Sequence, residues 1–343
     1  MLSRQEISEL IDRYMNSVYL SNGARIPAGY KIIEDTSEFF NIDYNDVLIL
    51  SNKPYLVRQC AKEGRFGIDE QDKFWVRHAV DLVDGNPKII KMPFHEKFTG
   101  TSGERTVDFN RSSSKEARIL RKTRGHPNFM QGFNVKDKTG HTVRIIDFIK
   151  GKTWSDYIVK LGSSHEDYYY NHFMTVFEEF IELVEAIAYI HHRGEIHGDI
   201  RRDHIIREME TGINKWIDFD LSYIIHGESH FLFDLLSLGN LLAFAAGRGD
   251  VTVQNVQNIL NLSSKFNQTC NQTDNQNQNQ NSGTITSEDL NINFRNRIIN
   301  LKKIYPYISG KLNDILLRFS CGAKVSYDGI TQFIDDLKEI EIL

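Results

Sequence analysis

Apolar positions recur with two different periods along the chain, so its first and second halves are expected to fold differently. Residues 3–20 carry apolar side chains at helical spacing, and Ser3 is followed by Glu6, the spacing of a capping box. Residues 42–98 instead contain β-branched and aromatic runs between turn signals, at 47–50, 55–60, 74–82 and 88–92. The pattern predicts an N-terminal helix followed by an antiparallel meander.

Helical spacing dominates beyond Gly151, after a transition region. A polar stretch at 99–113 leads into a helix predicted at 114–124, which ends near a Gly-His-Pro stop signal. Short strands are predicted around 129–136, 142–148, 196–207 and 215–219. Helices are predicted at 173–192, 233–246, 296–304, 312–319 and 331–339.

The composition is that of a globular protein, with 40% hydrophobic and 25% charged residues among 343. At about 150 residues per domain, this length allows two domains or one two-lobed unit. Residues 267–282 are nearly all Asn and Gln, so they cannot bury enough apolar area to offset the entropy of ordering. We expect a disordered insert there, at about 263–287.

Charge and cysteine content exclude several classes of function. A formal charge of −5 gives no basic field, so a nucleic-acid partner is not expected. The three cysteines lie far apart, which favours a reducing compartment over a disulfide framework. The most apolar stretch, 235–246, is too short to cross a bilayer. We therefore expect a cytoplasmic protein without a membrane partner, and the sequence leaves its oligomeric state open.

The strongest chemical signal is a pair of aspartates, Asp199 and Asp218, each beside an apolar strand. Their spacing suits residues that meet at one cleft. Asp199 could accept the proton of a hydroxyl group, and Asp218 could bind Mg²⁺ on nucleotide phosphates. The surrounding motifs are His197-Gly198-Asp199-Ile200-Arg201-Arg202-Asp203-His204 and Trp216-Ile217-Asp218-Phe219-Asp220.

Three weaker signals precede this pair in a fixed order. Each has a plain alternative: a glycine-containing hairpin is usually a turn, a strand lysine is usually at a solvated edge, and a helix glutamate is usually a surface charge. The three signals are Lys62-Glu63-Gly64-Arg65-Phe66-Gly67, Lys91 within an apolar strand, and Glu116 early on a helix.

With these motifs in this order, residues 53–340 resemble the protein-kinase-like superfamily, and most closely the eukaryotic Ser/Thr protein kinases. The resemblance implies an α+β, two-lobed fold, with an antiparallel N-lobe sheet carrying one helix, a helical C-lobe, and ATP between them. The implied organisation is an N-terminal helical extension at 1–50, the N-lobe and hinge at 51–150, and the C-lobe with its insert at 151–340.

The resemblance also implies roles for individual residues of the N-lobe. Lys91 corresponds to the lysine that contacts the α- and β-phosphates, and Glu116 corresponds to its helix partner. Gly64, Phe66 and Gly67 correspond to the loop that covers the phosphates, although Lys62 replaces its first glycine. Asp147 and Ile149 correspond to the hinge, where backbone groups would bind the adenine.

In the C-lobe, Asp199 corresponds to the catalytic aspartate, Arg201 to the catalytic-loop lysine, and Asp218 to the principal metal ligand. Asp234 corresponds to the residue that anchors the backbone of the catalytic loop. Gly198 replaces an arginine that requires a phosphorylated activation loop, so activity is expected without such phosphorylation.

Two departures affect the metal site. His204 replaces the second metal-binding asparagine, and Asp220 replaces a glycine, so both become candidate ligands for Mg²⁺ or Mn²⁺ beside Asp218. No Ala-Pro-Glu motif occurs between Asp218 and Asp234, which places the usual peptide-docking floor in doubt.

The sequence therefore predicts an ATP-dependent phosphotransferase that acts on Ser/Thr hydroxyls of a protein substrate. Two alternatives stay open. A small-molecule kinase of the aminoglycoside or sugar kinase type is favoured by the His-Gly-Asp motif and the short activation stretch. A pseudokinase that binds nucleotide without turnover is favoured by His204, Asp220 and the degenerate glycine loop.

Overall fold

The computed structural model of this chain describes residues 3–18, 29–65, 68–102, 105–225, 229–256 and 285–340. Two compact units make up the chain. The first comprises Met1–Phe98, Asn110–Lys150 and Asp218–Ser222, and the second comprises Thr99–Phe109, Gly151–Ile217 and Tyr223–Leu343. The predicted Asn/Gln-rich insert lies mostly outside the described residues.

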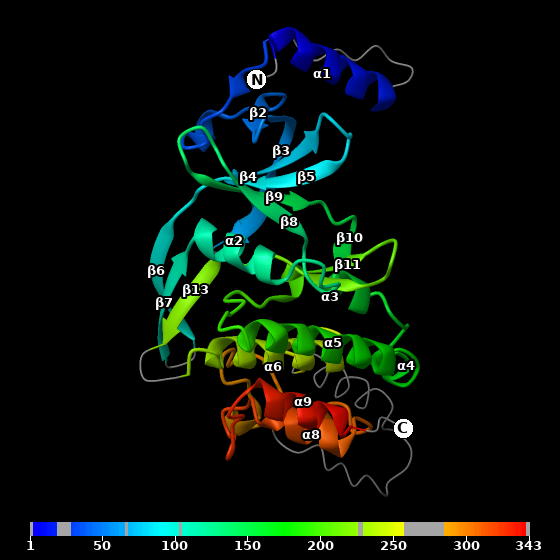
Figure 1. Cartoon of the computed structure of the whole chain (residues 1–343). Helices are drawn as coiled ribbons and strands as arrows, with labels where there is room; N and C mark the ends of the chain where they lie inside the picture. The colour runs from blue at the N-terminus through cyan, green and yellow to red at the C-terminus, as the bar shows by residue number, and fades with distance from the viewer. Residues whose placement is uncertain are drawn as a thin grey trace, which may run out of the picture. The chain divides into compact units, whose positions relative to one another are not determined.

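A seven-stranded sheet with the order β1-β2-β3-β4-β5-β9-β8 forms the base of the first unit (Figure 1). β1 is parallel to β2, and the remaining neighbours are antiparallel. The predicted meander is therefore confirmed over β2 to β5. The strands are β1 Ile32–Ile33, β2 Val47–Leu50, β3 Lys53–Arg65, β4 Ile68–Asp81, β5 Pro87–Lys91, β8 Gly132–Lys136 and β9 Thr142–Asp147.

The predicted N-terminal helix is confirmed as α1 (Arg4–Val18), and its capping box is present. The Ser3 N–H donates to the Glu6 carboxylate at 2.6 Å, and the Glu6 N–H donates to the Ser3 hydroxyl at 3.2 Å. Ile7 and Ile11 are buried against a small apolar cluster of the sheet that includes Val47. Apolar contact therefore fixes this helix on the first unit.

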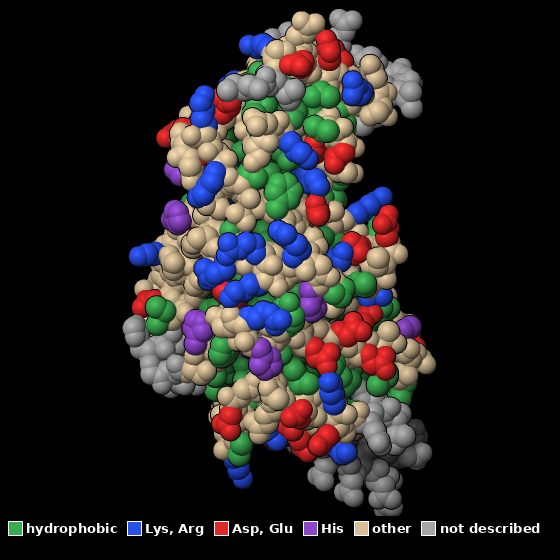
Figure 2. Space-filling view, viewed as in Figure 1, with side chains coloured by type: hydrophobic (Ala, Val, Ile, Leu, Met, Phe, Trp, Pro, Cys, Tyr) green, Lys and Arg blue, Asp and Glu red, His purple; other side chains and the backbone are tan. Residues whose placement is uncertain are grey.

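The helix predicted at 114–124 is confirmed as α2 (Ser113–Lys122). Ala117, Ile119 and Leu120 are buried along one face, together with the carboxylate of Glu116. The opposite face is basic, and Lys and Arg side chains gather over α2 in the space-filling view (Figure 2). An amphipathic helix that buries an acidic residue on its apolar side needs buried cations to pair with it.

Two strands lie in and beside the stretch at 99–113 that the sequence marks as polar. β6 (Glu96–Ser102) and β7 (Arg105–Arg111) form a sheet with β13 (Leu221–Ile225), in the order β13-β7-β6. Val107 of β7 is fully buried. Successive side chains of a strand point to opposite faces of the sheet. The polar residues on one face of β7 therefore make the stretch read as polar, although Val107 on the other face is buried.

Two other sequence predictions are corrected. Residues 1–50, expected as a helical extension, also contribute β1 and β2 to the sheet. The helix predicted at 296–304 is wrong, since this segment forms the short 3₁₀ helix η4 (Leu301–Lys303). The Ile298 N–H donates to the Val251 carbonyl at 2.8 Å, and the Ile299 N–H donates to the Asp289 carbonyl at 2.9 Å. Backbone groups that pair with distant segments cannot also form a helical ladder.

The second unit is mainly helical, as predicted, and α5 (Phe173–His191) is its longest described helix. Phe180 of α5 is fully buried and packs edge-to-face on Phe333, with ring centroids 6.2 Å apart. Within the described ranges, no helix combines the length and apolar content that crossing a membrane requires. The other helices are α3 Trp154–Ile158, α4 His165–Asn171, α6 Leu232–Ala246, α8 Gly310–Leu317 and α9 Ile330–Lys338, and a small sheet contains β10 Gly151–Thr153, β11 Ile205–Glu208 and β12 Asn214–Trp216.

Candidate functional site

A chain of buried ion pairs occupies the first unit, and we call it the buried ionic cluster. Isolated charges are costly to bury, so a cluster of this kind requires close pairing. Arg111 at one end also lies 3.5 Å from the partly exposed Glu96. The cluster consists of four cations, Lys73, Lys91, Arg111 and Arg144, and three anions, Glu116, Asp218 and Asp220, all buried.

Lys91 is at the centre of this cluster, at the end of β5. Its ammonium lies 2.7 Å from Glu116 Oε1 and 2.8 Å from Asp218 Oδ1. Burial alone would lower the pKa of Lys91, but the nearby carboxylates of Asp218 and Glu116 outweigh burial and raise its pKa. The structure therefore brings together the lysine and the glutamate that the sequence predicts as partners, and it holds the lysine charged.

Glu116 fixes three groups at once from α2. Its carboxylate accepts from Lys91, from Arg144 Nε at 3.1 Å, and from the Phe219 N–H at 3.2 Å. Burial raises the pKa of Glu116, but Lys91 and Arg144 overcome this effect and leave the pKa lowered. The side chain is therefore an anion that ties β5 and β9 to the segment around Phe219.

Asp218 has an uncommon backbone conformation and two ammonium partners. Its φ of 66° is in the left-handed region, which non-glycine residues adopt rarely and which often marks a functional residue. Its Oδ1 lies 2.8 Å from Lys91 and its Oδ2 lies 3.1 Å from Lys73. Both oxygens that could bind a divalent cation thus already hold a positive charge.

Asp220 does not have the arrangement expected of a metal ligand. Its carboxylate pairs with Arg111 Nη1 at 2.8 Å and is 3% exposed. Burial and the neighbouring charge of Asp218 raise the pKa of Asp220. In the described structure, this carboxylate serves as the partner of a buried arginine.

Sequence reasoning missed three cations of the cluster: Lys73, Arg111 and Arg144. Arg144 lies inside the apolar strand β9, so it carries the same sequence signal as Lys91 and could have been found by the same argument. Arg111 ends a strand that the sequence did not reveal. The direction of Lys73 depends on an irregularity in the pairing of β3 with β4, which local sequence does not indicate.

The remaining residues predicted for nucleotide binding are only partly described. Gly64 is near the end of β3, whereas Phe66 and Gly67 lie outside the described residues. Asp147 ends β9, where its N–H donates to the Gln131 carbonyl at 2.9 Å, and Ile149 follows two residues later.

The second unit holds the loop that contains Asp199, and Asp234 of α6 anchors it. The carboxylate of Asp234 accepts the N–H of His197 at 2.7 Å and the N–H of Gly198 at 2.9 Å, and it contacts His191 Nε2 at 3.0 Å. Burial raises the pKa of Asp234, but the hydrogen bond from His191 and the nearby histidines leave it lowered. The φ of Gly198 is 88°, a conformation that glycine adopts without strain. Two successive amides can therefore converge on one carboxylate.

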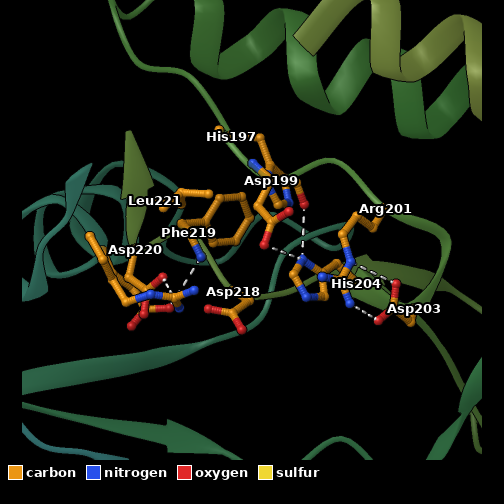
Figure 3. Close-up of polar contacts among 12 residues, drawn as sticks. His197, Asp199, Arg201, Asp203, His204, Asp218, Phe219, Asp220 and Leu221 are labelled. Carbon is orange, nitrogen blue, oxygen red and sulfur yellow. Dashed lines mark hydrogen bonds and ion pairs between the residues drawn. The ribbon is translucent and has the colours of Figure 1, made fainter. Parts of the chain in front are cut away.

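Asp199 is partly accessible, and His204 orients it. His204 Nδ1 lies 2.9 Å from the Asp199 carbonyl oxygen and 3.6 Å from its carboxylate (Figure 3). Arg201 is directed at Asp203, with Nε 3.1 Å from Oδ1. Burial raises the pKa of Asp203, but the hydrogen bond from Arg201 lowers it to about 2. His204, expected to bind metal, therefore contacts Asp199, and Arg201, expected near phosphate, pairs with Asp203 of the same loop.

A cavity of about 470 Å³ opens beside Asp199 within the second unit. Part of its wall is basic: Arg202 Nη1 and Arg297 Nη2 lie 2.6 and 3.2 Å from the same oxygen of Asp250. Phe244 and Phe294 stack under these guanidinium groups. The cavity thus combines a carboxylate suited to accept a proton, apolar walls and two arginines that share one anion.

Part of this chain is similar in sequence to known protein kinases. No protein-family model matches the sequence. A segment of 157 residues, 46% of this chain, is 24% identical to 28% of SNF1-related protein kinase catalytic subunit alpha KIN12 of Arabidopsis thaliana. The chain is similar in sequence to protein kinases. CBL-interacting protein kinase 11 of Oryza sativa subsp. japonica is 26% identical over 147 residues, 43% of this chain and 26% of the relative.

This similarity to protein kinases covers about a quarter of each plant relative. Two solved structures align with 13% identity: the kinase PK-1 of Cydia pomonella granulovirus, over 83% of this chain and 93% of that chain, and Rad53 1–466 in complex with AMP-PNP, over 76% and 60%. Their TM-scores are 0.45 and 0.44. The predicted resemblance to the protein-kinase-like superfamily is confirmed, and the mixed α+β fold agrees with it.

Proposed function

We propose that this chain is an ATP-dependent phosphotransferase of the protein kinase type, which transfers the γ-phosphate to Ser or Thr hydroxyls of a protein. The proposal rests on the position of Lys91: its buried ammonium lies 2.7 Å from Glu116 and 2.8 Å from Asp218. An ammonium fixed in this way is preorganised to bind phosphate oxygens, because its side chain needs no reordering when the nucleotide arrives.

Asp199 is the proposed proton acceptor. In the transfer, the acceptor oxygen bonds to the γ-phosphorus, the bond from that phosphorus to the β–γ bridging oxygen breaks, and ADP leaves. The proton of the acceptor hydroxyl passes to the Asp199 carboxylate. His204 and the amides bound by Asp234 position this residue. Gly198 supports the further proposal that no activation-loop phosphate is required.

The expected divalent cation does not fit the described residues well. Asp218 provides the hard oxygen donors that Mg²⁺ and Mn²⁺ prefer, but each of its oxygens holds an ammonium group. Asp220 is paired with Arg111, and His204 Nδ1 is directed at Asp199. We therefore assign no catalytic step to a metal ion.

A small-molecule kinase is the second candidate, and the cavity beside Asp199 favours it. Its volume of about 470 Å³ is typical of a pocket for a small ligand. Because its wall contains Arg202 and Arg297, the acceptor in this case would carry an anionic group. For the protein kinase, the same cavity would receive the segment around the acceptor hydroxyl.

The test is transfer of radiolabelled phosphate from ATP to a protein panel and, separately, to a panel of anionic hydroxyl compounds, with Mg²⁺ and with Mn²⁺. Labelled protein supports the leading proposal, and labelled small molecules support the second candidate. No transfer in either panel, together with ATP-induced thermal stabilisation, would indicate nucleotide binding without turnover. We further propose a cytoplasmic location, which rests on the sparse, unpatterned cysteines.

A further inference from the structure

The carboxylate of Asp218 binds a second lysine that the kinase resemblance leaves without a role. Lys73 of β4 has its ammonium 3.1 Å from Asp218 Oδ2, while Lys91 is bonded to Oδ1. The side chain of Lys73 is 9% exposed, and that of Asp218 is 10% exposed. Each oxygen of one buried carboxylate therefore has its own ammonium partner.

An irregularity in the pairing of β3 with β4 places Lys73 there. Cys60 is opposite Arg77, and the next residue of β3, Ala61, is opposite Lys73. β3 thus advances by one residue while β4 advances by four, which leaves three residues of β4 without a direct partner on β3. An odd insertion reverses the side-chain alternation of a strand. Lys73 and Val76 are three positions apart, so in a regular strand their side chains would point to opposite faces of the sheet. Val76 is opposite Lys91 of β5. Because the bulge reverses the alternation, both lysines can reach Asp218.

Lys73 and Lys91 pair with different oxygens of Asp218. Lys91 faces all three anions of the cluster, with Glu116 at 2.7 Å, Asp218 at 2.8 Å and Asp220 at 3.9 Å. The ammonium of Lys73 pairs with Oδ2 of Asp218 at 3.1 Å. A bare carboxylate beside a nucleotide triphosphate would repel it. An ammonium on Oδ2 removes that repulsion and can also bond to a phosphate oxygen.

We propose that Lys73 is a second phosphate-binding cation, and that it allows the chain to bind a nucleoside triphosphate without a divalent cation. The ammonium of Lys73 takes the place on Asp218 that a metal would need. This inference rests on the proposed function for the identity of its ligand. Lys73 also follows the β3–β4 hairpin that contains Gly64, which the kinase resemblance assigns to the phosphates.

The experiment measures the affinities of ATP and adenosine by calorimetry, in EDTA and in Mg²⁺, for the full chain and three variants. Lys73→Met removes the charge, Lys73→Arg keeps it, and Lys53→Met is the control. Lys53 is also a strand lysine near an aspartate, 3.8 Å from Asp81, but it is about half exposed and outside the cluster. Melting temperatures without nucleotide establish that each variant folds.

The expected result is ATP binding by the wild type in EDTA. In Lys73→Met, ATP affinity should fall by about tenfold or more, because one charge-assisted hydrogen bond is lost, while adenosine affinity stays unchanged. Lys73→Arg should stay within about threefold of the wild type, since it conserves the charge. Lys53→Met should bind both ligands as the wild type does.

Three results would overturn the inference: loss of wild-type ATP binding in EDTA, unchanged ATP affinity in Lys73→Met, or an equal loss of ATP and adenosine affinity. The last would indicate a purely structural ion pair. If Lys73→Met and Lys73→Arg both unfold, the inference rests on the wild-type result in EDTA. Phosphate transfer is measured in parallel, so ATP binding through Lys73 without transfer would refute the proposed function alone.

Discussion

Replacing Glu116 by Gln should destabilise the first unit strongly, because this substitution keeps the shape of the side chain and removes its charge. Glu116 is fully buried and accepts from Lys91 at 2.7 Å, Arg144 at 3.1 Å and the Phe219 N–H at 3.2 Å. Removing one partner of a buried ion pair costs about 3–5 kcal/mol. Lys91 keeps Asp218, and Arg144 keeps the Met92 carbonyl at 3.1 Å, so we expect about 3 kcal/mol, near the lower limit.

The assay is urea denaturation of the full chain, with a double-mutant cycle on Lys91→Met. Because the two side chains are in contact, the double variant should lose at least about 1 kcal/mol less than the sum of the single losses. Glu185→Gln is the matched control, since Glu185 pairs with Lys338 on the surface at 44% exposure, and we expect no measurable change there. A loss below about 1 kcal/mol for Glu116→Gln, or strict additivity with Lys91→Met, would refute this account of the cluster.

Three further predictions concern the second unit. Because the pKa of Asp234 is lowered, its ionised carboxylate stabilises the fold fully above pH 3.8, and this contribution is lost as pH falls below that value. In Asp234→Asn, the free energy of unfolding measured by denaturation should therefore fall less steeply between about pH 2 and 4 than in the wild type. An unchanged pH dependence would contradict this. Gly198→Ala should destabilise by about 1–2 kcal/mol, because a side chain must adopt a φ of 88°, and unchanged stability would show that the loop can avoid this conformation. Arg297→Ala should raise the KM for the phosphate acceptor and leave the KM for ATP unchanged in steady-state kinetics. An equal change in both KM values would show that the cavity does not bind the acceptor.

The sequence predicts the framework of the fold well where local pattern and tertiary packing agree. The capping box at Ser3 and Glu6 and the apolar runs of β2 to β5 are local features, and both appear as predicted. β7 was missed because its buried residues alternate with polar ones. The helix predicted at 296–304 failed because Ile298 and Ile299 use their backbone amides in pairing with distant segments.

The candidate site shows the same limit at the level of side chains. Lys91, Glu116 and Asp218 could be named from motif order, and in the structure the Lys91 ammonium lies 2.7 Å from Glu116 Oε1 and 2.8 Å from Asp218 Oδ1. Lys73 could not be named, because its direction depends on a bulge that no local pattern reveals. Asp220 was expected as a metal ligand, but its pairing with Arg111 depends on a strand that the sequence concealed.

The most direct test of the central claim compares the initial rate of γ-phosphate transfer from ATP by the wild type and by Asp199→Asn. Asp328→Asn, an exposed aspartate in the second unit, is the matched control. The account predicts transfer by the wild type and by the control, and a rate lower by about 10²–10⁴ in Asp199→Asn, because the proposed proton acceptor is lost. Equal rates in all three proteins, or no transfer by the wild type to any acceptor, would contradict the claim that this chain is a phosphotransferase acting through Asp199.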